Sequence, residues 1–193
     1  MSDYAPPPDG ITVARHERLS ALAICGATDA APEAALDGLV RLAARLCDAP
    51  MGLITLVDAV RQVSQAWVGF DVGASTALDV GYCAIVVERG EPVSVPDTLA
   101  DPAYAESAAA REGGVRFYAG VPLRAEGRRI LGALSIGDTA PRPACLTQAQ
   151  MDALTTLSAQ IVSQVELRRS LAQQAALLAE HCGRSTFSAR CAT

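Results

Sequence analysis

The stretch from residue 146 to residue 183 constrains the fold more than any other part of the chain, because nothing in it breaks a helix. The run Leu146-Thr-Gln-Ala-Gln150 is typical of a helix start, and the next glycine or proline is Gly183. Such a helix would far exceed the roughly dozen residues of an ordinary core helix. Apolar side chains recur along it at alternating spacings of three and four, with polar interruptions at Gln164 and Arg168. We expect its first half to cover a core and its second half to pair with a partner helix.

Five segments upstream of this helix carry the pattern of β-strands. Each is a short run rich in apolar and β-branched residues, bounded by turn formers. Asp58 ends the first run and the second follows closely, which predicts a hairpin, while the last two runs are joined by a turn around Glu126 and Gly127. The predicted strands are 51–57, 62–68, 92–96, 117–123 and 130–136.

Further segments carry helix signals, namely capping residues, apolar spacings of three and four, or a closing glycine. In one of them Asp29 can cap the helix and Pro32 suits its first turn. The predicted shorter helices are 11–25, a segment from Asp29 to Cys47, 82–88 and 103–112. The first two precede the strands, and the last two lie between strands.

The order of these elements predicts an α+β fold. We expect an antiparallel sheet of about five or six strands flanked by helices, followed by the long C-terminal helix. Residues 69–80, with several glycine and small polar side chains, are expected to form a loop. The predicted organisation is a flexible leader at 1–9, one domain at 10–170, and a helical extension and tail at 171–193.

The composition supports one soluble core and excludes several functions. Half of the 193 residues are hydrophobic, which suffices for a single core. The net charge of −5 disfavours nucleic acid, and the sequence shows no local basic patch. All 16 basic residues are arginine, so the chain has neither a Schiff-base lysine nor the phosphate-binding lysine of a P-loop.

The cysteines and the N-terminus indicate a cytoplasmic protein with reduced thiols. The six cysteines lie far apart, and the two histidines, His16 and His181, add no metal-site spacing, even with Cys182 and Cys191 nearby. We therefore predict no metal site. The start of the chain lacks a signal-peptide pattern and no apolar run approaches eighteen residues, so we expect no membrane association.

Several of these segments, in this order, resemble GAF domains of the kind found in bacterial sensor histidine kinases and related signalling proteins. The most telling motif is Phe117-Tyr-Ala-Gly-Val-Pro-Leu123 followed by Leu131-Gly-Ala-Leu134, which in GAF-like sequences forms the last two strands. The resemblance covers about residues 15 to 170. Its other motifs are Leu39 to Cys47, Leu53 to Asp58, Gly81-Tyr-Cys-Ala84, Val93 to Asp97 and Asp101-Pro102.

The resemblance implies a sensory or regulatory domain without catalysis, which binds a small molecule or acts as a dimeric module. A ligand would lie between one face of the sheet and the covering segments 69–90 and 97–117. Small residues, among them Thr55 and Ser135, leave room beside the sheet, and Tyr118 is a further aromatic that can wall the pocket. The cofactor is left open. The candidate ligand-binding residues are Trp67, Phe70, Tyr82, Cys83, Asp97, Tyr104 and Phe117.

Each of these assignments has an alternative. The aromatic side chains can simply pack a core. Cys83 can be an inert buried thiol, or a redox sensor or attachment point. Asp97 and Asp101 can cap free N–H groups of a turn and a helix, or they can face a ligand cation. For the whole chain, the alternatives are a GAF-like free methionine sulfoxide reductase, which needs several cysteines around one pocket, and a tetrapyrrole-binding photoreceptor.

The long helix implies a partner. We predict a homodimer through this helix, with Leu154, Leu157, Ile161 and Leu171 at the interface. The sequence shows no kinase, cyclase or phosphodiesterase segment, so we expect that it either signals to a partner in trans or is a detached module of a larger protein.

Overall fold

The computed structural model describes residues 34–57, 61–69, 75–77, 82–111, 114–126 and 129–190, and for residues 61, 75–77, 108 and 179–190 it describes the backbone alone. The predicted leader, the predicted helix 11–25, and the cap at Asp29 and Pro32 lie outside these residues. The helices are α2 (Ala34–Leu46), α3 (Cys83–Arg89), α4 (Pro102–Ala105), α5 (Ala108–Arg111) and α6 (Gln148–Arg190). The strands are β1 (Met51–Val57), β2 (Arg61–Val68), β3 (Ser75–Ala77), β4 (Val93–Val95), β5 (Phe117–Arg124) and β6 (Ile130–Asp138).

The described strands form one six-stranded sheet in the order β3-β2-β1-β6-β5-β4, and every neighbouring pair is antiparallel. The centre of the sheet is the trio β1, β6 and β5. Side chains on both faces of β5 and β6 are buried from Phe117 to Leu123 and from Leu131 to Gly137. Both faces therefore need a cover. This architecture confirms the predicted α+β fold with a mainly antiparallel sheet.

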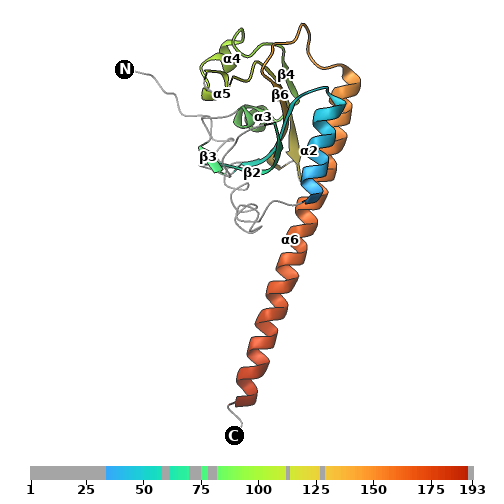
Figure 1. The fold of residues 1–193 in the computed structure, drawn as a ribbon. Coiled ribbons are helices and arrows are strands. Elements are labelled where there is room, and N and C mark those ends of the chain that lie inside the picture. Colours follow the sequence, from blue (N-terminus) through green and yellow to red (C-terminus); the bar gives the residue numbers. More distant parts are fainter. Residues whose placement is uncertain are drawn as a thin grey trace, which may run out of the picture.

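One face of the sheet is covered by α2 and the first half of α6. These helices lie side by side along the sheet, and α6 continues far beyond it (Figure 1). The side chains of Leu36 and Val40 from α2 meet Ile54 from β1 in this core, where all three are fully buried. Leu154, Leu157 and Ile161 of α6 pack in the same core.

This packing corrects part of the predicted dimer interface. Leu154 and Ile161 have no exposed surface, and Leu157 is only 9% exposed, so these three side chains belong to the core of one chain. Leu171, by contrast, is 57% exposed. The same spacing of three and four residues therefore serves the domain's own core in the first half of α6.

Three elements differ from expectation in their details. The predicted loop 69–80 contains the short edge strand β3, which pairs with β2. The predicted helix 103–112 is split into α4 and α5, because the Ser107 hydroxyl bonds both the Tyr104 carbonyl and the Ala110 amide and starts a new turn. The long helix passes through Gly183 and ends at Arg190. The helix predicted at 82–88 is α3, and Gly90, in a left-handed conformation, ends it as expected.

Arg142 ties the end of α2 to the sheet. Its guanidinium donates hydrogen bonds to the carbonyl oxygens of Cys47 (2.8 Å) and Asp48 (2.7 Å), which follow the last turn of α2. It also lies 4.1 Å above the centre of the Phe117 ring on β5. A cation at a helix C-terminus satisfies carbonyl groups that have no partner in the helix. Arg142 thus holds α2, β5 and the loop before α6 in one arrangement.

Among the residues that the structure describes, no helix combines the length and the apolar character that crossing a membrane requires.

The close approach of β1 to Gly132 on β6 generates a stability prediction. A Cβ atom at Gly132 would lie 1.9 Å from the Thr55 carbonyl oxygen, so Gly132→Ala forces β1 and β6 apart and should cost about 3 kcal/mol or more. Gly38→Ala, on α2, is the control. Among the described residues a Cβ there meets nothing within 4 Å, and the helix should gain up to about 1 kcal/mol. Urea unfolding measures both. Equal midpoints for Gly132→Ala and the wild type would refute this close approach.

Candidate functional site

The second face of the sheet is covered by α3 and by residues 97–111, which include α4 and α5, and 114–116 (Figure 1). Three tyrosines meet there, one from α4, one from β5 and one directly before α3. The ring centres of Tyr82 and Tyr118 are 4.8 Å apart and those of Tyr82 and Tyr104 are 5.2 Å apart, both pairs edge to face. We call Tyr82, Tyr104 and Tyr118 the tyrosine cluster. All three are buried.

A row of neutral polar groups lies beneath this cluster. The Cys83 thiol is 3.5 Å from the Thr55 hydroxyl and 3.6 Å from the Ser135 hydroxyl. The Ser135 hydroxyl in turn bonds the Tyr118 hydroxyl at 2.9 Å. Thr55, Cys83, Ser135 and Tyr118 form what we call the hydroxyl–thiol chain. All four residues are buried, so each hydrogen bond replaces water that the group has lost.

The position of Tyr118 depends on Gly120, two residues along β5. A Cβ atom at Gly120 would lie 2.7 Å from the Tyr118 hydroxyl oxygen and 2.9 Å from a Val86 methyl carbon. The phenol therefore lies back over the glycine and reaches Ser135. Burial raises the pKa of Tyr118 well above its ordinary value, so this phenol stays protonated.

The Tyr104 hydroxyl differs from that of Tyr118. Tyr104 is fully buried, yet its hydroxyl has no hydrogen-bond partner among the described residues. Burial raises the pKa of this phenol too, while the guanidinium of Arg89, 5.9 Å from the ring centre, opposes the shift. A buried hydroxyl without a partner costs about 1–3 kcal/mol, so this group is where a bound molecule can gain most from one hydrogen bond.

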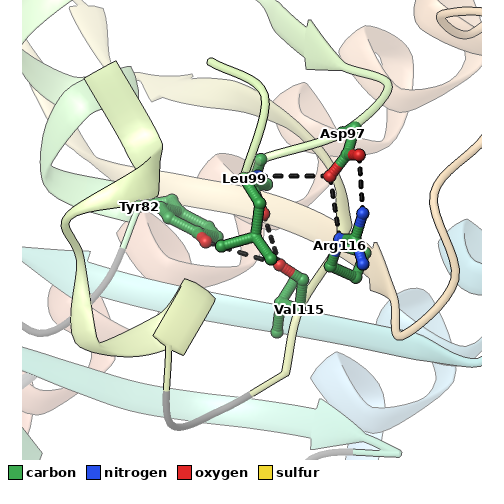
Figure 2. A network of polar contacts seen from close by, with 6 residues as sticks. Tyr82, Asp97, Leu99, Val115 and Arg116 are labelled. Atoms are coloured by element: carbon green, nitrogen blue, oxygen red, sulfur yellow. Dashed lines mark hydrogen bonds and ion pairs between the residues drawn. The ribbon is translucent and has the colours of Figure 1, made fainter. Parts of the chain in front are cut away.

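The covering segment is fastened at Val115 (Figure 2). The Val115 carbonyl oxygen accepts a hydrogen bond from the Thr98 hydroxyl at 2.6 Å and a long one from the Tyr82 hydroxyl at 3.5 Å. Tyr82 therefore belongs both to the tyrosine cluster and to the fastening of the segment above it.

Asp97 and Arg116 lie at the two ends of the covering segment and bond each other. The Arg116 guanidinium donates two hydrogen bonds to the Asp97 carboxylate, at 2.8 and 2.6 Å, and the carboxylate also accepts from the Leu99 amide at 3.2 Å (Figure 2). The hydrogen bond from Arg116 holds the pKa of Asp97 below its ordinary value. Both side chains are partly exposed, so water screens this pair and its role is to position the segment.

This arrangement is suited to recognition. It places neutral hydrogen-bonding groups beside aromatic rings, and such combinations are typical of small-molecule sites. In the described part of the chain, no three histidine, cysteine, aspartate or glutamate side chains come together in a way that could hold a metal ion.

The comparison with protein families agrees with this architecture. The model of the GAF domain matches residues 31–177, which is most of the chain. The chain belongs to the GAF domain family. This confirms the resemblance drawn from the sequence motifs.

Three similar proteins show how widely the fold is used. A cyclic di-GMP phosphodiesterase of Pseudomonas aeruginosa is 27% identical over 128 residues, which are 66% of this chain and 22% of that protein. The GAF domain of an Acinetobacter phosphoenolpyruvate-protein phosphotransferase superimposes with a TM-score of 0.60 at 19% identity, covering 82% of this chain and 97% of that one. A type II free methionine-R-sulfoxide reductase from Thermoplasma acidophilum gives 0.56 at 14% identity, with coverages of 79% and 94%. The chain spans about a fifth of the phosphodiesterase, and the two structures show the fold alone.

The GAF fold brings together some of the predicted ligand-binding residues and separates others. Tyr82, Cys83 and Tyr104 meet in the site, together with Tyr118. Trp67, half-buried, pairs in register with Leu53, whose side chain packs against the buried residues of this second core, so Trp67 shares this face of the sheet. Phe70 lies outside the described residues.

Two predicted ligand-binding residues have a different role in the structure. Phe117 faces the opposite core, under Arg142, because adjacent residues of a strand point to opposite faces and Tyr118 takes the site face. Asp97 is engaged with Arg116 and Leu99, as the alternative of a turn-capping carboxylate predicts, and Asp101 caps α4 through the Ala103 amide.

The polar members of the site were harder to foresee. From the sequence, Thr55 and Ser135 are expected only to leave room, whereas in the structure their hydroxyls hold the Cys83 thiol. The signal that could have found them is their position within otherwise apolar strands: a buried hydroxyl in such a strand needs a partner on the same face.

The described cysteines do not converge. Cys83 lies in the site, Cys47 lies in the core on the other face of the sheet, and Cys145 is exposed beside β4. Burial raises the pKa of the Cys47 thiol to about 11, which keeps it protonated. Among these three, the site therefore holds a single thiol, whereas the reductase alternative needs several. The side chains of Cys25, Cys182 and Cys191 lie outside the described residues.

The Asp97–Arg116 pair generates a prediction on pH dependence. Because the pKa of Asp97 is lower in the folded state, its contribution is fully present above the ordinary value of 3.8 and is lost as the pH falls through the folded pKa. Asp97→Asn should therefore be less stable than the wild type at neutral pH, and the difference should shrink in strong acid. Urea midpoints at both pH values measure this. Asp101→Asn keeps a capping side chain and serves as the control. A difference that is equal at both pH values would contradict the role assigned to the ion pair.

Proposed function

We propose that this GAF domain is a sensory module without catalysis, which binds a small molecule at the tyrosine cluster and signals through α6 as a cytoplasmic homodimer. The output would pass to a partner protein or to a further domain. The observation that carries the proposal is the contrast along α6, whose first half is part of the core while its second half exposes leucines to solvent.

Leu171 and Leu178, in the exposed part of α6, can pack against a partner helix. Side chains from Ser170 to Leu178 are all exposed, and an isolated helix of this kind is only marginally stable in water. Leu171 (57% exposed) and Leu178 (72% exposed) are seven residues apart and, with Ala175, continue the spacing of three and four residues. This repeat is typical of a two-stranded coiled coil, and an identical helix supplies the same repeat. We therefore favour a second copy of the chain.

The chemistry of the site supports a small and largely neutral ligand. The described groups of the hydroxyl–thiol chain are uncharged, and the tyrosine rings offer apolar faces with polar edges. The nearest described cation, Arg89, is exposed and lies over the Tyr104 ring. A strongly charged molecule buried among these groups would lose its hydration without gaining an opposite charge.

The Tyr104 hydroxyl makes the ligand testable without knowing its identity. We expect protein purified without additives to carry a non-covalent small molecule in native mass spectrometry. Tyr104→Phe should lower the retained fraction about two- to tenfold, because it removes one hydrogen bond. After unfolding and refolding to remove the ligand, the same variant should be at least as stable as the wild type, since a buried hydroxyl without a partner is gone.

Tyr118→Phe is the matched control for this experiment. It also removes one phenolic oxygen, but that oxygen bonds Ser135, so the refolded variant should lose about 1 kcal/mol of stability in urea. The ligand proposal fails if the wild type carries no extra mass and the Tyr104→Phe protein binds or unfolds just as the wild type does.

The dimer is tested on exposed leucines only. Leu171→Glu with Leu178→Glu places like charges in the proposed seam and should give monomers in light scattering, with the urea midpoint of the domain nearly unchanged. Gln173→Glu with Ala176→Glu adds the same two charges to the outer face of the helix and should leave the dimer intact. A wild-type monomer, or equal masses for the two double variants, would rule out α6 as the dimer interface.

A further inference from the structure

A β-bulge in β2 lies between the site and α6. The pairing of β1 with β2 is regular on both sides of one shift, where Ile54 pairs with Ala66 and Thr55 pairs with Ser64. Gln65 is therefore the extra residue of the bulge. Bulges of this kind change the direction in which a side chain points.

The bulge turns Gln65 toward α6. In a regular strand, Gln65 and its neighbour Ala66 would point to opposite faces of the sheet. Ala66 lies in the core under α2 and α6, and yet Gln65 Oε1 accepts a hydrogen bond from Arg168 Nη2 of α6 at 3.1 Å. Both residues therefore face the helices. Gln65 is buried, so this bond forms at the protected base of the helix.

Arg168 marks the point where α6 leaves the domain. Between Gln148 and Leu178, where the side chains of α6 are described, Val165 is the last that is buried, and Leu167 is already 54% exposed. Beyond this point the helix runs away from the sheet (Figure 1). The bond between Arg168 and Gln65 thus holds α6 at its exit, where a small rotation produces the largest movement of the free end.

Thr55 lies on the other side of the bulge and belongs to the site. Its hydroxyl is 3.5 Å from the Cys83 thiol, and its backbone is where β2 shifts register. On its other edge, β1 is pressed against β6, where even a methyl group at Gly132 would collide with the Thr55 carbonyl. A displacement of Thr55 is therefore resisted on the β6 side, and the irregular β2 side is the one that can adjust.

We propose that Thr55, the bulge at Gln65 and Arg168 connect the state of the site to the direction in which α6 leaves the domain. Gln65 and Arg168 act as positioning residues: they contact no ligand, and they fix the exit of the helix. The proposal rests on the proposed function in one respect, namely that α6 carries the output. Coupling of this kind is shown by the failure of two substitutions to act independently.

The experiment is a double-mutant cycle on the full chain, read by hydrogen exchange of the backbone amides of residues 166–178. Thr55→Val removes the hydroxyl from the site with little change of shape, and Arg168→Ala removes the bond at the exit. We expect Thr55→Val alone to change exchange in this part of α6 about threefold or more, and to change it little when Arg168→Ala is already present. Gln65→Ala should behave as Arg168→Ala does.

Two controls separate coupling from general destabilisation. Arg169→Ala removes a positive charge one position along and should leave the effect of Thr55→Val intact. Ser135→Ala perturbs the same hydroxyl–thiol chain from β6 and not from the bulged pair of strands, and should affect α6 less than Thr55→Val does. If Thr55→Val unfolds the chain, Thr55→Ser, which moves the hydroxyl without removing it, takes its place in the cycle.

The proposal is overturned if Thr55→Val has no effect on α6, or has the same effect with and without Arg168. Light scattering on every variant distinguishes this failure from a failure of the proposed function. Variants that are dimers but show no coupling would refute the proposed connection and not the proposed dimer. Monomers that show coupling would refute the dimer and not the connection.

Discussion

The central strands of this GAF domain are apolar on both faces, and most other features of the structure follow from the need to cover them. One face is covered by two regular helices, α2 and α6, which supply long rows of leucine and valine. The other face is covered by the short helix α3 and by an irregular segment with two single-turn helices. Under this second cover, the Thr98 and Tyr82 hydroxyls bond the Val115 carbonyl, while Thr55, Cys83, Ser135 and Tyr118 bond one another.

The two covers also differ in how they are held. The helical side is fixed by dense apolar packing and by Arg142, which joins α2, β5 and the loop before α6. The irregular side is fixed by a few hydrogen bonds that converge on the Val115 carbonyl and by the Asp97–Arg116 pair at the surface.

The sequence was sufficient for the fold wherever a periodic pattern was long. The segments from Phe117 to Leu123 and from Ile130 to Ile136 are predicted as strands because they are short apolar runs, and the length of α6 is predicted because its segment lacks helix breakers. The sequence does not predict the three-residue strand β3, because its residues are small and mostly polar. Only its pairing with β2 makes it a strand. The split between α4 and α5 depends on one serine hydroxyl, which an alanine-rich segment does not reveal. Leu154, Leu157 and Ile161 were assigned to a dimer because a core-facing helix and a coiled coil share nearly the same spacing.

The residues of the site are harder to predict than the fold. Their prediction requires knowing which of two neighbouring side chains in a strand points to the site face of the sheet. Phe117 and Tyr118 are equally plausible ligand contacts in the sequence, and only the register of β5 against β6 assigns Phe117 to the helical core and Tyr118 to Ser135. A single bulge changes this assignment for every residue that follows it. Gln65 illustrates the point: the alternation of β2 would place it on the site face, and the shift between Ile54 and Thr55 gives it to α6 instead.

The polar residues Gln164 and Arg168 interrupt the apolar repeat of α6 near the point where the helix leaves the sheet. Before them the repeat packs on the sheet, and after them it faces solvent. A continuous apolar stripe would allow the helix to slide or to bury more of its length on the domain, because hydrophobic contacts have no preferred direction. A hydrogen bond from a charged side chain to a fixed acceptor does have a preferred direction. Arg168 therefore lies where the apolar repeat of α6 passes from the part packed on the sheet to the part exposed to solvent.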